Sequence, residues 1–351
     1  MEKRVTLLQL AERLGLHHTT VSRALRGHPA IAESTRQKVR QLAEELGYCP
    51  DPYLTALAAY RHGGHKADYT GTLAWVTNWP VQNAWHAHSI WRRYFEGARE
   101  RAAALGYRLE EFWEPGTDLR RTLRVLHARS IQGVLFMAQP EPHMHLKMDL
   151  SRCSAVAFGF TLKSPMLHGV ACNHHRTMMK LLEKLHSLGY RRPGLVTLRI
   201  LEERLDWCYC AAFQAYMSGK CEQQNVPLLI LRELDRELLL EWIREHRPDV
   251  IIAPIVGEVR ALLIEAGLRI PEDVGLVPLA LSDSDRGSFA GMDENGKVVG
   301  AAAVDLLVGM LHRNERGVPE HPQKLMIEGT WVDGRSVRTP DSSGECALPN
   351  A

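Results

Sequence analysis

The sequence predicts an α/β protein in which a small helical unit, called the headpiece here, precedes a larger part made of two doubly wound parallel sheets. Three observations support this class. Three apolar stripes with helical spacing fall within about the first fifty residues. From Gly71 onward, short apolar runs alternate with amphipathic stretches, which is typical of parallel strands covered on both faces by helices. This alternation runs through twice, so we expect two Rossmann-like lobes.

The headpiece stripes predict three short helices. The stretch from Thr6 to Gln9 fits a capping box at the start of the first helix, and Gly15 is expected to end it. A second helix following so closely can share one core with the first and third in a helix-turn-helix arrangement. The apolar positions of the three stripes are Leu7, Leu10, Ala11, Leu14, Val21, Ala24, Leu25, Val39, Leu42, Ala43 and Leu46.

The polar side chains of the second stripe are expected to face away from this core and toward DNA. Hydroxyl groups can bind phosphates or base edges, and arginine can pair with guanine in the major groove. Residues 1–61 hold nine Lys or Arg against six Asp or Glu, whereas the remaining residues hold 34 against 35. A solvated helix face without a ligand is the alternative, which leaves this uneven charge unexplained. The outward residues are His18, Thr19, Ser22, Arg23 and Arg26.

A further short helix is expected after the headpiece. Asp51 and Pro52 suit its N-cap and first position, and Leu54 and Leu57 share one face. Because a helix this short is unstable alone in water, it should form only against a partner. The expected divisions are a headpiece at 1–49, a hinge helix and linker at 50–66, a two-lobed effector-binding and dimerisation domain at 67–340 and a flexible tail at 341–351.

Residues 5–52, from "VTLLQLAERLG" to "LGYCPDP", resemble the headpiece of the LacI/GalR family of bacterial transcription regulators. The resemblance implies that the "TVSRAL" helix lies in the major groove and that Leu57 wedges into the minor groove. Packing of Leu57 against the large domain is the alternative. The family favours a serine cap where this chain has Ala32. The DNA-binding residues implied are Thr6, Leu7, His17, His18, Thr19, Thr20, Ser22, Arg23, Arg26, Thr35 and Leu57.

The resemblance continues through "GYRRPGLVT" and "GLRIPEDVGLV" to "EGTWVDGRSV". It implies a periplasmic-binding-protein-like fold whose two lobes are joined by crossovers near residues 161, 290 and 322, with a small effector in the cleft. Lobe or dimer packing is the alternative for the tryptophans among the predicted site residues. The effector-binding residues predicted are Asn78, Trp79, Trp85, Trp91, Asn173, Arg204, Tyr209 and Glu294.

The chain departs from the sugar-binding members of the family at the second wall of the cleft. Those members carry two aspartates and an arginine there, whereas this chain has uncharged residues, with Tyr209 at the arginine position. Either the effector is less polar than a sugar, or the pocket is vestigial, or nearby polar groups substitute. The candidate substitutes are Arg204, Asp206, Asp283, Asp293 and Glu294.

The resemblance implies a homodimer, acting as a repressor on a pseudo-palindromic operator in double-stranded DNA, with a small-molecule effector for which a carbohydrate-related compound is one candidate. An effector-independent regulator and a receptor without a DNA role are the alternatives.

The sequence lacks GxGxxG after a strand, GxxxxGK[ST], HExxH and GxSxG, so we expect no enzyme, catalytic residue or cofactor. In "ACNHHR" a helix cap or ligand contact is favoured over a Cys/His nucleophile, and no metal site is predicted. Seven cysteines without a CxxC, no long apolar run and no signal-peptide pattern favour reduced thiols in the cytoplasm and no membrane partner.

Overall fold

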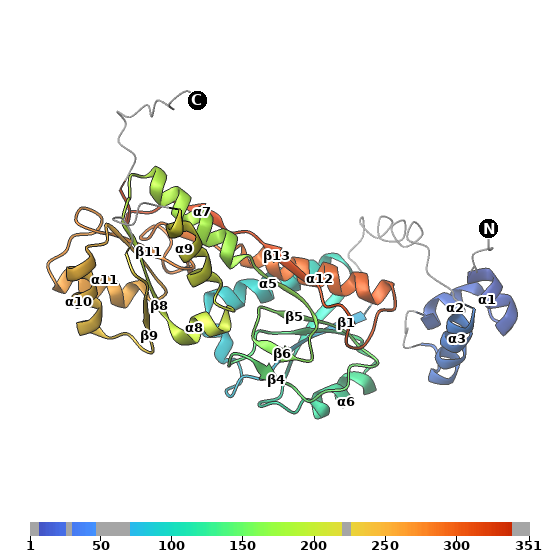
Figure 1. Cartoon of the computed structure of the whole chain (residues 1–351). Helices are drawn as coiled ribbons and strands as arrows, with labels where there is room; N and C mark the ends of the chain where they lie inside the picture. The colour runs from blue at the N-terminus through green and yellow to red at the C-terminus, as the bar shows by residue number, and fades with distance from the viewer. Residues whose placement is uncertain (1–6, 26–29, 47–70, 220–225, 339–351) are drawn as a thin grey trace, which may run out of the picture.

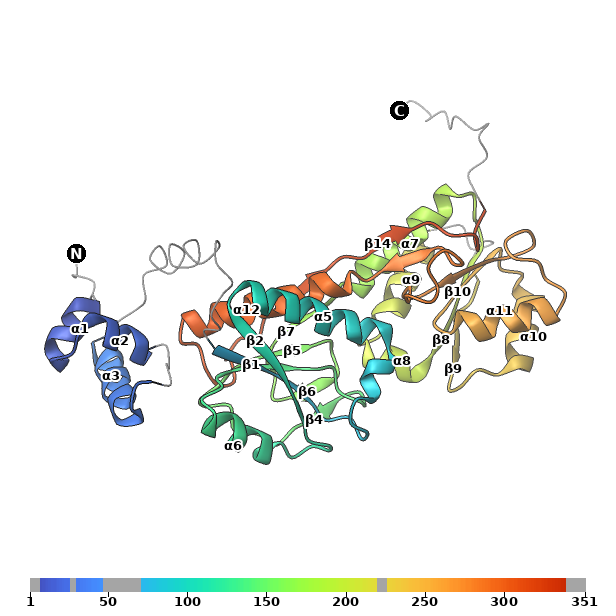
Figure 2. The same ribbon diagram turned by 180° about the vertical axis from the view of Figure 1, so that it is seen from behind.

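The computed structural model describes residues 7–25, 30–46, 71–219 and 226–338, which Figures 1 and 2 show from opposite sides. Several predicted features lie outside these residues, and their predictions are not tested. They are the site residues Thr6, Arg26 and Leu57, the hinge helix and linker at 50–66 and the tail at 341–351.

The headpiece consists of α1 (Leu7–Leu14), α2 (His18–Leu25) and α3 (Glu33–Glu45). Gly15 follows α1 with a φ of +61°, in the left-handed region that glycine adopts at helix ends. The three apolar stripes meet in one small core, as predicted for a helix-turn-helix unit. Its buried residues are Leu10, Ala11, Val21, Ala24, Val39 and Ala43.

The first lobe, called the N lobe here, is built on a six-stranded sheet of order β13-β7-β5-β3-β1-β2, in which all neighbours pair in parallel. A short helix, η1 (Ala84–Ala87), and a small strand pair, β4 (Met144–His145) with β6 (Leu162–Ser164), lie outside this sheet. The six strands are β1 (Gly71–Thr77), β2 (Tyr107–Trp113), β3 (Gly133–Phe136), β5 (Ser154–Phe158), β7 (His168–Cys172) and β13 (Lys324–Ile327).

Both faces of this sheet are covered. Leu73 and Trp75 of β1 join the core formed with α5 (Ser89–Ala104) and α12 (Gly296–His312). Their neighbours Ala74 and Val76 point to the opposite face, where they join the core formed with α6 (Arg120–Ala128). Because successive side chains of a strand point to opposite faces, a strand buried on both sides is apolar throughout. The apolar run "GTLAWVT" therefore predicted β1 correctly.

Helices α5 and α12 pack backbone against backbone and lie side by side in both views (Figures 1 and 2). A Cβ atom added to Gly97 would lie 2.0 Å from the carbonyl oxygen of Lys297, and one added to Gly300 would lie 1.9 Å from that of Tyr94. Only glycine fits at these two positions, so the two helices form one tightly joined layer.

The second lobe, called the C lobe, contains a four-stranded parallel sheet of order β11-β10-β8-β9. Its strands are β8 (Pro193–Leu198), β9 (Leu229–Leu231), β10 (Val250–Ala253) and β11 (Gly275–Pro278). One face packs on α7 (His174–Ser187) and α9 (Cys208–Ser218), and the other on α10 (Arg236–His246) and α11 (Val256–Glu265). Helix α8 (Arg199–Arg204) follows β8, and β12 (Gly291–Asp293) pairs antiparallel with β14 (Thr330–Val332).

The chain passes between the lobes three times; the second crossover lies close to its predicted position near 290, and the other two are displaced. Strand β7 pairs with β5 and β13 inside the N lobe, so the first crossover lies at residues 172–174 rather than near 161. The second lies at 293–296, between β12 and α12. Strand β13 also belongs to the N lobe, which moves the third crossover from near 322 to 327–330. The two-lobed architecture with parallel sheets is confirmed.

In the part of the chain that the structure describes, no helix combines the length and the apolar character that crossing a membrane requires.

Candidate nucleic-acid interface and lobe interface

Helix α2 presents a polar face opposite the headpiece core. Val21 and Ala24 are fully buried. His18, Thr19 and Arg23 on the same helix are exposed. Because apolar and polar positions alternate with helical spacing, packing Val21 inward turns the polar side chains outward. The predicted contacts His17, Thr20 and Ser22 are exposed or partly exposed beside them.

His17 organises the first turn of α2. Its carbonyl oxygen accepts hydrogen bonds from the backbone N–H groups of Thr20 at 2.9 Å and Val21 at 3.2 Å. Its Nδ1 lies 2.8 Å from the Thr19 hydroxyl and accepts from the Thr19 N–H at 3.4 Å. The imidazole also lies against that of His18, with ring centroids 4.2 Å apart. The side chains at the N-terminus of α2 therefore hold one another in place.

Two further predicted residues support this helix from the rest of the headpiece. Leu7 is partly buried and packs against the headpiece core, and Thr35 is half-buried in the first turn of α3. The backbone N–H groups of Thr35 and Arg36 both donate to the carbonyl oxygen of Ala32 at 3.0 Å. Alanine has no side-chain oxygen, so this helix begins without a side-chain cap.

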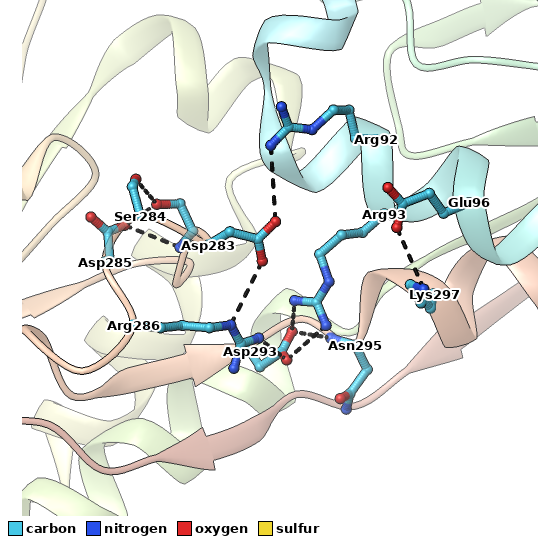
Figure 3. A network of polar contacts seen from close by, with 11 residues as sticks. Arg92, Arg93, Glu96, Asp283, Ser284, Asp285, Arg286, Asp293, Asn295 and Lys297 are labelled. Atoms are coloured by element: carbon cyan, nitrogen blue, oxygen red, sulfur yellow. Dashed lines mark hydrogen bonds and ion pairs between the residues drawn. The ribbon is translucent and has the colours of Figure 1, made fainter.

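An ion-pair network joins the N lobe to the second crossover (Figure 3). Arg93 of α5 donates two hydrogen bonds to Asp293, at 2.8 and 3.1 Å. Arg286 of the C lobe donates to the same carboxylate and also pairs with Asp283 at 3.7 Å. Asp283 in turn lies 4.0 Å from Arg92 of α5.

The protonation of Asp293 reflects these partners. Burial raises the pKa of its carboxyl, but the hydrogen bonds from Arg93 and Arg286 outweigh burial and leave the pKa below its ordinary value. Its Oδ1 also accepts from the backbone N–H of Asn295 at 2.9 Å. The charged carboxylate thus fixes the start of the second crossover to both lobes.

A second group of side chains lies at the crossovers, and we call Cys172, His174, Tyr209 and Glu294 the hinge cluster. All four are buried. The Tyr209 hydroxyl lies 3.1 Å from both Nδ1 of His174 and Oε1 of Glu294, and these last two atoms are 3.3 Å apart. The thiol of Cys172 lies 3.5 Å from the Thr177 hydroxyl. Burial, reinforced by the nearby Glu294, raises the pKa of Cys172 and of Tyr209.

Arg204, at the end of α8, reaches across to the N lobe. Its guanidinium donates to the carbonyl oxygens of Gln139, at 2.8 Å, and of Pro140. Burial lowers the pKa of Arg204. The side chain of Gln139 is 1% exposed and donates to the Met137 carbonyl. Among the described residues, its Oε1 finds no hydrogen-bond partner.

The predicted effector-binding residues divide into two groups. Tyr209 and Glu294 touch each other in the hinge cluster, and Arg204 lies at the lobe interface. The remaining five are occupied within their own lobe. Asn78 donates to the Gly116 carbonyl, Trp79 donates to the Ala138 carbonyl, Trp91 packs on Tyr94, Asn173 caps α7 and Trp85 lies in the N-lobe core.

Trp85 is the clearest departure from its predicted role. It is 1% exposed, and its ring lies 5.8 Å from that of Trp75 and 5.4 Å from that of Phe95. A fully buried ring has no face left for an effector, so core packing, the alternative considered for the tryptophans, describes it. The His86 ring stacks on it at 3.8 Å.

The site residues that sequence reasoning missed are Cys172, His174 and Gln139. "ACNHHR" was interpreted as a helix cap or ligand contact, and Asn173 is indeed the cap of α7, accepting from the Arg176 N–H at 3.0 Å. The signal in that motif was the pair Cys172 and His174 on either side of the cap, since thiol and imidazole side chains are common metal ligands. Their third neighbour, Glu294, is distant in sequence.

The headpiece matches a known family. Residues 6–51 fit the model described as "Bacterial regulatory proteins, lacI family". The HTH-type transcriptional regulator GntR of Pseudomonas aeruginosa is 50% identical over 56 residues, which are 16% of this chain and 16% of that protein. The HTH-type transcriptional regulator AscG of Escherichia coli is 26% identical over 203 residues, or 55% of each. The chain thus spans well under two thirds of the length of these relatives.

Solved structures resemble the fold over nearly the whole chain. A CelR–cellobiose complex has a TM-score of 0.56 at 17% identity, and the match covers 95% of this chain and all of that one. The lac repressor dimer bound to operator and the anti-inducer ONPF has a TM-score of 0.56 at 16% identity, covering 96% of this chain and all of that one. At such low identity these matches establish the shared architecture.

Proposed function

We propose that this chain, whose residues 6–51 match the lacI family of bacterial regulatory proteins, is a sequence-specific DNA-binding transcriptional regulator that acts as a repressor. The observation that carries the proposal is the polar face of α2, where His18, Thr19 and Arg23 are exposed above a buried Val21. A helix of about 10–12 Å diameter with side chains fits the major groove of DNA.

We propose that two copies of the chain bind one pseudo-palindromic operator, one headpiece to each half-site. A two-fold symmetric dimer matches a two-fold symmetric sequence, and the similar fold of the lac repressor dimer on its operator supports this arrangement. A regulator of bacterial genes acts where the chromosome lies, so we expect it in the cytoplasm.

We further propose that a small molecule bound between the lobes changes operator affinity. The unpartnered Oε1 of Gln139 supports a ligand that donates a hydrogen bond there, just beyond the carboxyl end of β3. Hydroxyl-rich compounds related to carbohydrates are the first class to screen, because a CelR structure of similar fold contains cellobiose. Typical coupling of about 1–3 kcal/mol would change operator affinity by about 5- to 150-fold.

A regulator of constant operator affinity is the second candidate. The side chains of Asn78, Asn173 and Arg204 already form hydrogen bonds within the protein. They need no ligand for hydrogen bonding, which favours a regulator without an effector. A thermal-shift screen separates the two candidates. A ligand at 100 times its Kd adds about 2.7 kcal/mol of stability, whereas a vestigial pocket gives no shift with any compound.

DNA binding is tested by fluorescence anisotropy on operator candidates selected from genomic fragments. Log affinity should fall linearly with log salt, with a slope of about −0.9 per phosphate neutralised. Arg23→Ala should weaken binding to the best site by about 1–3 kcal/mol and relax the preference for one base pair. The matched control is Arg121→Ala, which removes an exposed arginine from α6 of the N lobe. Equal losses in the two variants would contradict the proposed role of α2.

A further inference from the structure

The hinge cluster contains three side chains whose donor atoms are those of a metal site. Cys172 ends β7, His174 begins α7 two positions later and Glu294 lies in the second crossover, so the three come from two segments that are distant in sequence. All three are buried, and one ligand atom from each lies within 4.8 Å of the others. A helix cap does not require a thiol, an imidazole and a carboxylate to meet at one point, so the cap formed by Asn173 does not account for this cluster.

The spacing of the nearest pair suits a tetrahedral ion. Two nitrogen or oxygen ligands, each about 2.0–2.1 Å from zinc at tetrahedral angles, lie about 3.3 Å apart. Nδ1 of His174 and Oε1 of Glu294 are 3.3 Å apart. The sulfur of Cys172 lies within 4.8 Å of a ligand atom of each of the other two residues. It therefore needs only a short approach to complete the site around an ion.

The surroundings also fit a bound cation. The carboxyl group of Glu294 is buried, and its Oε1 lies 3.3 Å from Nδ1 of His174. A buried carboxylate is stable only when paired or bound to a metal. The Tyr209 hydroxyl, which lies 3.1 Å from Glu294 Oε1, can donate to this carboxylate and orient it, as outer-shell groups do in metal sites.

We propose that Cys172, His174 and Glu294 bind one divalent transition-metal ion, with the Tyr209 hydroxyl positioning the Glu294 carboxylate. Sulfur and imidazole donors select zinc-like ions over magnesium or calcium, which prefer oxygen. A solvent molecule completes a four-coordinate shell. The proposal departs from the sequence analysis, which predicted no metal site.

The site has a consequence for regulation, and this part rests on the proposed function. Its ligands flank the first crossover and lie in the second, so an ion would tie the two crossovers together. The angle between the lobes would then depend on metal occupancy. A divalent transition metal would thereby serve as an effector of operator binding.

Metal binding is tested on the full chain without DNA, after removal of metal with a chelator. Titration with Co²⁺ should give a thiolate-to-cobalt charge-transfer band that saturates at one ion per chain and disappears when Zn²⁺ is added. The band should be lost in Cys172→Ser and retained in Cys153→Ser, which alters another buried free cysteine. A wild-type protein without the band, or a band that survives in Cys172→Ser, overturns the site.

Three further variants test the other two ligands and Tyr209, and they keep the test valid if Cys172→Ser fails to fold. His174→Asn and Glu294→Gln should each weaken Co²⁺ binding by more than about tenfold, and Tyr209→Phe by about 10- to 100-fold. Unchanged affinity in the first two variants overturns the ligand assignment.

Operator anisotropy with and without Zn²⁺ then tests the regulatory part separately. A change in operator affinity in the wild type that is absent in Glu294→Gln supports it. The same affinity with and without Zn²⁺ in a protein that shows the cobalt band overturns regulation by metal. Failure to bind any DNA fragment would instead overturn the proposed function, because the cobalt band is measured without DNA.

Discussion

Arg93 and Asp293 lie 200 positions apart in the chain and form a two-pronged ion pair, with Nη1 to Oδ1 at 2.8 Å and Nη2 to Oδ2 at 3.1 Å. This parallel geometry is the strongest arrangement available to arginine and a carboxylate. It fixes the second crossover to α5, and Arg286 binds the same carboxylate from the C lobe. One acidic side chain therefore contributes contacts to both lobes at the second crossover.

Asp293→Asn should destabilise the protein. The side chains of Arg93 and Asp293 are 21% and 11% exposed, and the variant leaves two guanidinium groups without their carboxylate. We expect a loss of about 1–3 kcal/mol in the free energy of unfolding, measured by urea titration. Asp305→Asn is the control, because its pair with Arg101 is 42% and 48% exposed. That variant should lose no more than about 1 kcal/mol, and an equal loss would contradict the prediction.

The same carboxylate makes stability depend on pH. Its hydrogen bonds hold the pKa of Asp293 below its ordinary value despite burial, so its contribution is complete above the unfolded value of about 3.9 and is lost as pH falls through the lower folded value. Asparagine does not titrate there. The difference in unfolding free energy between wild type and Asp293→Asn should thus be constant near neutral pH and shrink in acid. Urea titrations at successive pH values measure it, and a difference that does not shrink as the pH falls below the unfolded value of about 3.9 would contradict the assignment.

Gly300→Ala should disrupt the contact between α5 and α12. The new Cβ would lie 1.9 Å from the Tyr94 carbonyl oxygen, which belongs to the backbone and cannot rotate away. We expect a loss of at least about 1–3 kcal/mol, read from the urea midpoint. Gly309→Ala on the same helix meets only the end of the Arg313 side chain, at 3.1 Å. That control should gain up to about 1 kcal/mol from helix propensity.

Ala32→Ser should stabilise the headpiece. A serine oxygen at this N-cap position can accept a hydrogen bond from the first turn of α3, and such caps contribute about 0.5–1 kcal/mol. Amide hydrogen exchange in α3 should slow by about 2- to 5-fold. Ala30→Ser, an exposed position ahead of the cap, is the control and should leave exchange unchanged. Faster exchange in Ala32→Ser would show that the substitution disturbs the turn instead.

The headpiece could be predicted from sequence because its signals are local. Leu10, Val21 and Val39 repeat with helical spacing inside short segments, and Gly15 marks the end of α1. The alternation of strands and helices was equally visible, since each strand buried on both faces is one apolar run. Crossover positions were not visible, because they depend on which strands pair. Nothing within "HGVAC" states that β7 lies between β5 and β13.

The lobe interface was only partly predictable for a related reason. Tyr209 and Glu294 were selected from the resemblance, but their contact with His174 arises only when three distant segments fold together. Trp85 was selected because three tryptophans share one loop, and only packing with Trp75 and Phe95 decides which ring is buried. Long-range side-chain neighbours leave no periodic signal in a single sequence.

Because α5 packs closely on α12, a movement of the chain at the second crossover would be transmitted to both helices. Helix α12 begins at Gly296, two positions after Glu294, and its 17 residues form a rod of about 25 Å. A tilt of about 10° at the first turn would therefore displace the far end by about 4 Å, given this length. Because α5 packs closely against α12 at Gly97 and Gly300, the two helices would tilt together. A small displacement of the chain beside Glu294 would therefore become a larger displacement at the far end of α12.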